Sequence, residues 1–275
     1  MAVLDEKVAI VTGSARGIGR ATAEILSEQG AKVLINDLDG DVAEQTASEI
    51  AGDTLVFGGD LTKPGVPDEL VQKVVDEWGR VDILVNNAGY TLDAPIHKMS
   101  DEWFQKMLDI HSIVPFRMCR AVAPHMREPA KQEREEGREV FRKIVNVTSI
   151  SGTMGNAGQA NYSSGKAAVT GLTKTLAKEW GQFKINVNAV AFGYIETRLT
   201  ASKDDTNVAE IGGEKVQLGI PDQLRGMASM LIPLGRPGTP QEAASAVFLL
   251  CSPWANFIHG QIVNVTGGQF SGMYT

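Results

Sequence analysis

Cysteine and histidine are scarce in this sequence. Its 275 residues include only two cysteines, Cys119 and Cys251, which lie far apart and outside any metal-binding spacing. Isolated thiols of this kind are typical of a reducing compartment, so we expect both to be buried packing residues of a cytoplasmic protein. The four histidines form no cluster in the sequence, and no metal site is predicted.

Long apolar runs and blocks of one charge are also absent. No stretch approaches the roughly 18 consecutive apolar residues of a membrane-spanning helix. The first six residues have no basic flank before an apolar core, so no signal peptide is expected. The net charge is −7 and no basic block stands out. We therefore expect neither a membrane nor a nucleic acid as a partner.

The chain instead contains short apolar runs that alternate with amphipathic, helix-like segments. Continuously apolar strands between helices are typical of a parallel sheet that is covered on both faces. With 43% hydrophobic residues, the chain can bury the core of a large α/β domain. We predict one Rossmann-type domain over residues 1–275, with a seven-stranded, parallel, doubly wound sheet. The predicted strands are 8–11, 32–35, 54–57, 83–85, 144–147, 185–190 and 262–265.

Helices are predicted up to residue 26 and at 41–50, 66–78, 101–126, 167–178 and 241–251. Two other segments interrupt this alternation. Residues 127–142 hold five basic and five acidic residues. We expect them to form a solvated helix extension or loop, with partner binding as an alternative. Residues 198–238 are irregular and contain several glycines.

A tyrosine and a lysine lie four residues apart at the start of the helix around 167–178. Residues at this spacing share one helix face, so Tyr162 and Lys166 are expected to lie side by side. An ammonium beside a phenol favours the phenolate and lowers the phenol's pKa. Ser149 follows an apolar strand and is expected to face the same space. The three residues predict a proton donor and acceptor, although Tyr162 could also be a half-buried aromatic residue.

Several polar or glycine-rich segments follow the predicted strands directly. In a parallel sheet the ligand binds outside the carboxyl ends of the strands, so we expect these segments to form one crevice. They are residues 12–19, Asp37, Asp60, residues 86–89, Ser149 and residues 191–197.

Taken in order, these motifs resemble the short-chain dehydrogenase/reductase family over nearly the whole chain. Residues 12–19 have the form Thr-Gly-x-x-x-Gly-x-Gly, and residues 86–89 are Asn-Asn-Ala-Gly. Ser149 precedes a Tyr-x-x-x-Lys motif, and Gly267-Gly268 follows the last strand. Within the family, residues 152–162 are most similar to bacterial 3-oxoacyl-acyl-carrier-protein reductases of fatty acid biosynthesis.

The resemblance implies a nicotinamide dinucleotide cofactor. Glycines at the first turn let the backbone approach a pyrophosphate at a helix N-terminus. Asp37 is expected at the adenosine ribose, where a carboxylate accepts both hydroxyls and repels a 2′-phosphate. Because of Asp37 we expect NAD. Arg16 favours NADP, which is kept as the alternative, and Asp37 could also merely cap the next helix. The expected cofactor residues are Gly13, Arg16, Gly17, Ile18, Gly19, Asp37, Asp60, Leu61, Asn86, Asn87, Ala88, Gly89, Tyr162, Lys166, Ile195 and Thr197. Asn87 is also expected to brace the central strands.

The resemblance also assigns catalytic roles. Tyr162 is the expected proton donor, Ser149 a hydrogen-bond partner of the reacting oxygen, and Lys166 the group that tunes Tyr162 and binds the nicotinamide ribose. The family usually has an asparagine where this chain has His111. Because Pro115 has no N–H, the His111 carbonyl lacks its helical donor and could hold a water that relays protons to Lys166. His111 could add a titrating group of its own, or simply pack between helices.

The expected activity is NAD(P)-dependent hydride transfer to a 3-oxoacyl thioester, with acyl carrier protein as a possible partner. A 3-hydroxyacyl-CoA, steroid or other secondary-alcohol dehydrogenase is the alternative, and a non-catalytic sensor or scaffold is the alternative of another class.

Phe192 departs from the family's proline before the nicotinamide contacts. Residues 198–238 are expected to form a substrate lid, unless their apolar residues pack at a subunit contact. The family also implies a homotetramer, built on residues 241–251 and the last strand. The apolar lid residues are Leu224, Met227, Met230, Leu231 and Ile232.

Overall fold

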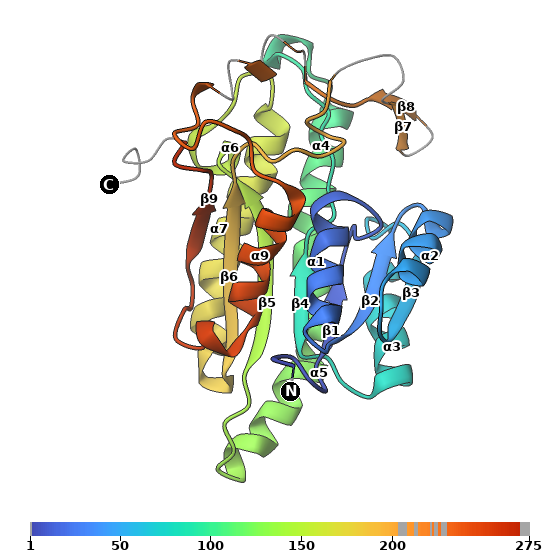
Figure 1. The fold of residues 1–275 in the computed structure, drawn as a ribbon, viewed down its shortest axis with the longest axis vertical. Coiled ribbons are helices and arrows are strands. Elements are labelled where there is room, and N and C mark those ends of the chain that lie inside the picture. Colours follow the sequence, from blue (N-terminus) through green and yellow to red (C-terminus); the bar gives the residue numbers. More distant parts are fainter. Residues whose placement is uncertain are drawn as a thin grey trace.

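The seven predicted strands pair in one parallel sheet in the order β3-β2-β1-β4-β5-β6-β9, which confirms the predicted fold. The computed structural model describes residues 2–202, 208–211, 214–220, 222, 225–226 and 230–269. In Figure 1 the strands run upward. They are β1 (Val8–Val11), β2 (Lys32–Asp37), β3 (Thr54–Gly58), β4 (Ile83–Asn86), β5 (Arg142–Ser149), β6 (Ile185–Phe192) and β9 (Ile262–Val265).

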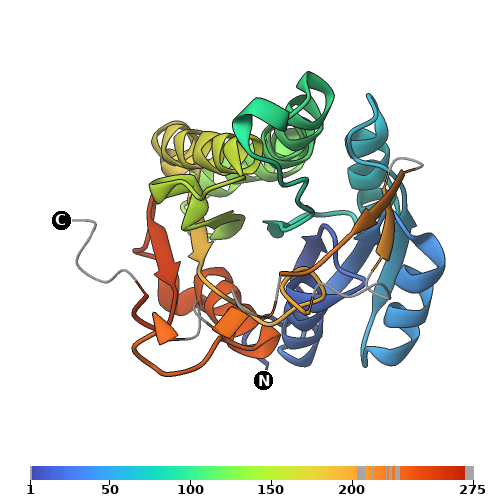
Figure 2. The same ribbon diagram turned by 90° about the horizontal axis from the view of Figure 1, so that it is seen from above.

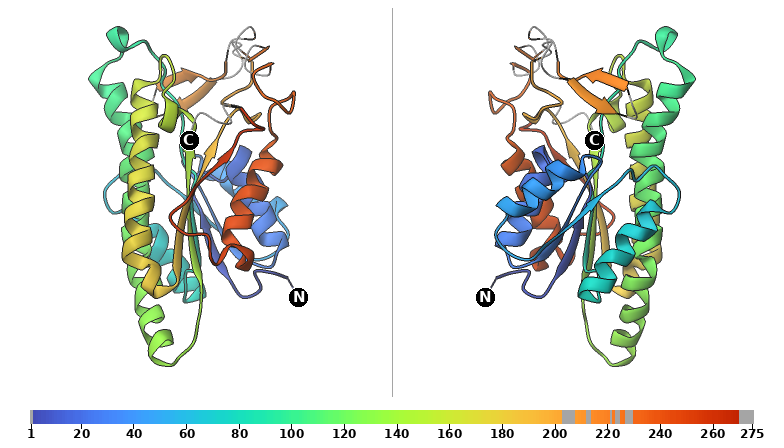
Figure 3. Two further views of the ribbon diagram at one scale, coloured as in Figure 1. Left: turned by 90° about the vertical axis from the view of Figure 1, so that its left-hand side faces the viewer. Right: turned by 90° about the vertical axis from the view of Figure 1, so that its right-hand side faces the viewer.

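Helices cover both faces of the sheet, as Figure 3 shows in side view. Strands β1, β4, β5 and β6 are buried along their whole length. Their apolar side chains pack into both layers, and buried polar residues of β5 and β6 such as Asn146 and Asn188 are hydrogen-bonded. One face carries α1 (Gly17–Glu28), α2 (Gly40–Glu49) and α9 (Pro240–Cys251). The other carries α3 (Val66–Trp78), α4 (Asp101–Leu108), α5 (Val114–Glu135) and α7 (Ala160–Trp180).

The chain reverses direction across the sheet between β1 and β4. Strands β1, β2 and β3 extend to one edge, and the chain then returns to pair β4 on the other side of β1. At such a switch point the loops after the two central strands separate, and a ligand can enter between them. Figure 2 looks down on these carboxyl ends, where the loops after β1, β4, β5 and β6 lie.

The helix predicted at 101–126 is longer and less regular than expected. It consists of α4, a π-helical segment η2 (Asp109–Ile113) and α5, which continues to Glu135. Pro115 sits at the second position of α5, directly after the π-helical segment. Proline has no N–H to donate to the carbonyl four residues earlier. The π turn before it holds one extra residue, which shifts the hydrogen-bond register, and the helix continues past Pro115.

The charged segment at 127–142 is only partly solvated. Residues 127–135 extend α5 beyond the sheet, as Figures 1 and 3 show. Within it, Arg142 and Glu133 form a buried ion pair, with side chains 4% and 12% exposed and a shortest N–O distance of 2.7 Å. The pair connects the end of α5 to the start of β5. The predicted helix extension is present and most of the segment is exposed or partly exposed, but Ala130, Glu133 and Arg142 are buried.

The segment 198–238 contains a two-stranded antiparallel ribbon that the sequence did not predict. Strands β7 (Val208–Ile211) and β8 (Glu214–Gln217) form it. In Figure 1 the ribbon lies above the ends of the sheet on the side of α2. The predicted lid residues Leu224 and Met227 lie outside the described residues, whereas Met230 and Leu231 are exposed and Ile232 is buried. The remaining short elements are η1 (Ile96–Lys98), α6 (Ser151–Met154), η3 (Gly181–Phe183) and η4 (Pro253–Ala255).

Candidate active site

The turns after β1 and β4 are locked together by side chains. The Thr12 hydroxyl accepts hydrogen bonds from the backbone N–H groups of Asn87 and Ala88, both at 3.0 Å. The Asn87 amide donates to the carbonyls of Thr12 and Gly13, both at 2.9 Å. A Cβ atom on Gly13 would lie 2.7 Å from the Ala88 Cα, and one on Gly19 only 2.2 Å from the Gly13 oxygen. Both positions therefore require glycine.

The turn before α1 fits a dinucleotide pyrophosphate. The N-cap residue of α1, Arg16, makes no side-chain cap, and the first turn carries no acidic residue. The N–H groups of this helix end are therefore directed at the crevice without an internal carboxylate, which suits an anion. Gly17 has a φ of +57°, and a Cβ atom there would meet Thr197 at an ordinary 3.8 Å. Ile18 is partly buried against the apolar core beneath.

The end of β2 presents two carboxylates. Asp37 Oδ2 accepts from the Ala15 N–H at 3.2 Å, which holds this side chain against the glycine turn. Asp39 caps α2, because its side chain accepts from the Val42 N–H at 3.3 Å. The alternative that Asp37 merely caps the helix is therefore wrong. Asp39 also forms an ion pair with Arg16 at 3.0 Å.

The other expected cofactor residues differ in what they present to the crevice. The Asn86 side chain is buried and donates to Asn146 at 2.8 Å, so it joins β4 to β5 and leaves the backbone of Asn86 for any cofactor contact. Leu61 and Ile195 are buried in the apolar core, which leaves their backbone atoms for any cofactor contact. Asp60 accepts from the N–H and hydroxyl of Thr62. Gly89 lies against the His111 ring.

Ser149, Tyr162 and Lys166 come together at the carboxyl end of β5. Ser149 ends that strand, and Tyr162 and Lys166 occupy successive turns of α7, which begins at Ala160 instead of near residue 167. The Ser149 hydroxyl accepts from the Ser151 N–H at 3.1 Å and hydrogen-bonds the Tyr162 phenol. The Lys166 ammonium donates to the Val147 carbonyl at 2.7 Å. The predicted trio therefore shares one site.

The charges of this trio differ from the expectation. Burial raises the pKa of Tyr162 to about 12, and the hydrogen bond with Ser149 offsets only part of that rise. Burial also lowers the pKa of Lys166 to about 7. The Lys166 ammonium lies over the Tyr162 ring, 5.7 Å from its centroid. Desolvation of the phenolate thus outweighs the hydrogen bond with Ser149, so the pKa of Tyr162 is raised, whereas the sequence pattern predicted that it would be lowered.

His111 is a buried neutral imidazole. Its Nε2 donates to the Tyr90 carbonyl at 2.7 Å, and its ring meets the Tyr162 ring edge-on with centroids 4.8 Å apart. Burial, followed by the nearby Lys166 charge, holds the pKa of His111 well below 6.5. His111 therefore does not add a group that titrates near neutrality, contrary to one expectation. The water held by its carbonyl stays a prediction.

Comparison with known proteins places this geometry in a family. The family described as enoyl-(acyl carrier protein) reductase matches residues 13–269. The 3-oxoacyl-[acyl-carrier-protein] reductase FabG of Vibrio cholerae is 38% identical over 97% of this chain and 98% of its own. The corresponding proteins of Thermotoga maritima and Escherichia coli are 36% and 37% identical, each over 96% of this chain, and over 98% and 97% of their own lengths.

The chain belongs to the short-chain dehydrogenase/reductase family. The predicted family is thereby confirmed, and the chain is an oxidoreductase that uses a nicotinamide dinucleotide. No helix in the described part of the chain is long and apolar enough to cross a membrane.

The crevice of this short-chain dehydrogenase/reductase includes polar residues that sequence reasoning missed. Gln159 donates to Asp93 at 3.0 Å and accepts from Asn156 at 3.0 Å, which ties the loop after β4 to the start of α7. Asn161 is fully buried and donates to the Leu92 carbonyl at 2.9 Å. Their only sequence signal was proximity to the Asn-Asn-Ala-Gly and Tyr-x-x-x-Lys motifs.

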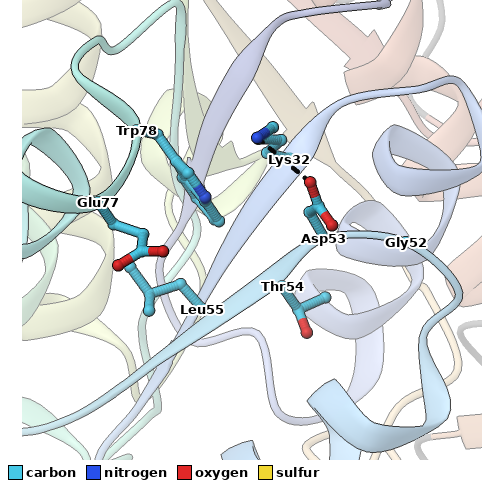
Figure 4. Close-up of a pocket in the computed structure, with 7 residues that line it drawn as sticks. All are labelled: Lys32, Gly52, Asp53, Thr54, Leu55, Glu77 and Trp78. Atoms are coloured by element: carbon cyan, nitrogen blue, oxygen red, sulfur yellow. Dashed lines mark ion pairs between the residues drawn. The ribbon is translucent and has the colours of Figure 1, made fainter.

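Two surface depressions in the described part of the chain differ in their distance from the candidate site. The first, shown in Figure 4, is lined by Trp78 and by the Lys32–Asp53 ion pair of 3.2 Å. It lies where β2 and β3 begin, at the opposite edge of the sheet from Tyr162. The second is lined by residues that include Thr197 and Arg225, next to the glycine turn and the segment 198–238.

Proposed function

We propose that this chain reduces 3-oxoacyl thioesters carried by acyl carrier protein. The observation that carries the proposal is the convergence of Ser149, Tyr162 and Lys166 beside the glycine turn. The relatives named 3-oxoacyl-[acyl-carrier-protein] reductase, which match nearly the whole chain, support the choice of substrate.

Each of the three side chains has a role in the proposed reaction. A bound nicotinamide supplies the hydride. Tyr162 is protonated at neutral pH and donates its proton to the oxygen of the substrate carbonyl. Ser149 hydrogen-bonds the same oxygen and orients it toward the phenol. Lys166, with a pKa of about 7, can exchange a proton near neutrality and can resupply Tyr162. The His111 carbonyl is proposed to hold the water that links Lys166 to solvent.

We propose NAD as the preferred cofactor. The Asp37 carboxylate is held at the glycine turn by the Ala15 N–H, where it would accept hydrogen bonds from the hydroxyls of an adenosine ribose and would repel a 2′-phosphate. Gly13, Gly17, Gly19, Asn87 and Ala88 form the surrounding cradle.

The lid and the assembly are also proposals. Residues 198–238 would cover the substrate, and the exposed Met230 and Leu231 offer apolar surface for an acyl chain. A homotetramer is supported by exposed apolar residues on α9 and after it, Leu249, Trp254 and Phe257, next to the open edge of β9.

The test is a substrate panel. Acetoacetyl thioesters of acyl carrier protein, of coenzyme A and of a short thiol are reduced with NADH and with NADPH, and kcat/KM is compared. We expect the carrier-protein thioester and NADH to be preferred. Tyr162→Phe should lose about 10²- to 10⁴-fold in kcat, because its proton transfer is removed. No turnover of any thioester, or an unaffected Tyr162→Phe, would contradict the proposal.

A further inference from the structure

Arg16 at the glycine turn is held by a carboxylate on the neighbouring helix. Its Nη2 lies 3.0 Å from Asp39 Oδ2, and the two side chains are 43% and 47% exposed. The bond crosses from the N-cap of α1 to the N-cap of α2. It therefore joins the two helix ends on either side of the Asp37 carboxylate.

Asp39 is fixed independently of Arg16. Its Oδ1 accepts from the Val42 N–H at 3.3 Å, and its own N–H donates to Asp37 Oδ1 at 3.3 Å. The carboxylate is thus oriented by the helix cap and by Asp37, while the long Arg16 side chain is the adaptable member. It follows that Asp39 determines where the guanidinium lies.

Asp39 is influenced by more than one arginine. The hydrogen bond from Arg16 is the largest cause that lowers the pKa of Asp39, and Arg198 at the root of the lid segment acts in the same direction. A 2′-phosphate beside the adenosine ribose is stabilised by a guanidinium that can form charge-assisted hydrogen bonds with it. With Asp39 in place, that phosphate would have to compete with a carboxylate for Arg16 and would also face the charge of Asp37.

We propose that Asp39 is a specificity-determining residue that acts through Arg16 to weaken binding of NADP(H). The inference rests on the proposed function, because it concerns the same dinucleotide site. Asp37 contacts the ribose directly, and Asp39 keeps Arg16, the one basic residue of the glycine turn, from binding a 2′-phosphate. Half-exposed ion pairs are weak, so the effect on affinity is expected to be moderate.

The test uses Asp39→Asn, because asparagine is as good a helix cap as aspartate and leaves α2 intact. Dissociation constants for NADH and NADPH are measured by fluorescence titration on the whole protein. We expect NADPH to bind about 10-fold more tightly to Asp39→Asn, with NADH changed less than about 2-fold, as expected for a moderate charge interaction of about 1.4 kcal/mol.

The double variant Arg16→Met/Asp39→Asn, measured against Arg16→Met alone, isolates the coupling. If Asp39 acts through Arg16, the tighter binding of NADPH should disappear in the double variant. Glu49→Gln is the matched control, since Glu49 also pairs with an arginine, Arg20 at 2.8 Å, and its loss changes the net charge equally. That variant should bind both cofactors as the parent does.

Three results would overturn the proposal: equal tightening in Glu49→Gln, tightening that survives in the double variant, or weaker binding of both cofactors to Asp39→Asn. Equal tightening in Glu49→Gln would indicate an effect of net charge. Tightening in the double variant would indicate that Asp39 repels the 2′-phosphate directly. Weaker binding of both cofactors would indicate that Asp39 serves only as the helix cap. Preference for NADPH by the parent protein would contradict the proposed use of NAD, while the coupling between Arg16 and Asp39 would still be decided by the double variant.

Discussion

Lys166 is a buried amine whose burial costs stability. It is 5% exposed and its pKa is lowered from 10.5 to about 7. Between these two values the unfolded chain binds a proton that the folded chain releases, so stability should rise with pH through this window. We expect Lys166→Met to inactivate the enzyme and, without added nucleotide, to raise the melting temperature below about pH 7.

The measurement is thermal unfolding of both proteins from about pH 6 to about pH 10, which covers the window and the range below it. Lys143, whose pKa burial lowers to about 8, contributes a slope of the same sign, so the slope of Lys166→Met should shrink without vanishing. A variant that melts at a lower temperature than its parent throughout the range would contradict the expectation.

His111 differs from Lys166 because it stays neutral. Its pKa lies well below 6.5, so His111 should contribute no ionisation to the pH profile of kcat/KM near neutrality. We expect the profile of His111→Asn to have the same shape as that of the parent, even if its height changes. The profile is measured with a saturating cofactor. The loss of a limb between about pH 6 and 7 in the variant would show that the imidazole titrates there.

Among the elements, α5 depends on a charge pair buried beneath it. Arg142 Nη1 and Nη2 donate to the two carboxylate oxygens of Glu133 at 2.7 and 2.9 Å. Removing one partner leaves a buried charge without compensation. We therefore expect Arg142→Met to lower the free energy of unfolding by about 3–5 kcal/mol, whereas Arg142→Met/Glu133→Leu should restore most of the loss. Denaturant unfolding measures both, and equal destabilisation by the two variants would refute this account.

The same element shows which features a sequence can predict. The strands and α1, α3 and α9 follow from local apolar patterns. The glycine turn joins the neighbouring elements β1 and α1, and the Tyr-x-x-x-Lys motif lies within α7. The extension of α5 was one of the predicted alternatives, but the buried pair of Glu133 with Arg142 was not, because the charges of the segment alone indicated a solvated face. The inward turn of Asn86 and the raised pKa of Tyr162 depend on neighbours from distant segments, which no local pattern contains.

At the scale of the whole molecule, the proposed tetramer can be tested by measuring the mass of the particle in solution. Phe257 is fully exposed, next to the Phe248–Trp254 ring pair, whose centroids lie 6.0 Å apart. If this surface is buried between subunits, Phe257→Glu should reduce the mass by light scattering from about four times that of the 29.5-kDa chain to that of a dimer or monomer. Ile96→Glu, at another exposed apolar residue, should leave the mass unchanged. A tetramer in both variants would exclude this surface.

The bonds between Thr12 and Asn87 also have a consequence for biosynthesis. These hydrogen bonds join residues 75 positions apart. A nascent chain that has emerged only as far as β3 therefore contains the turn after β1 but lacks the turn after β4. Affinity for the nucleotide is thus acquired only after β4 has been translated and docked beside β1. The nucleotide can then stabilise strands β1 to β4 after they have paired. It cannot promote the earlier pairing of β1, β2 and β3.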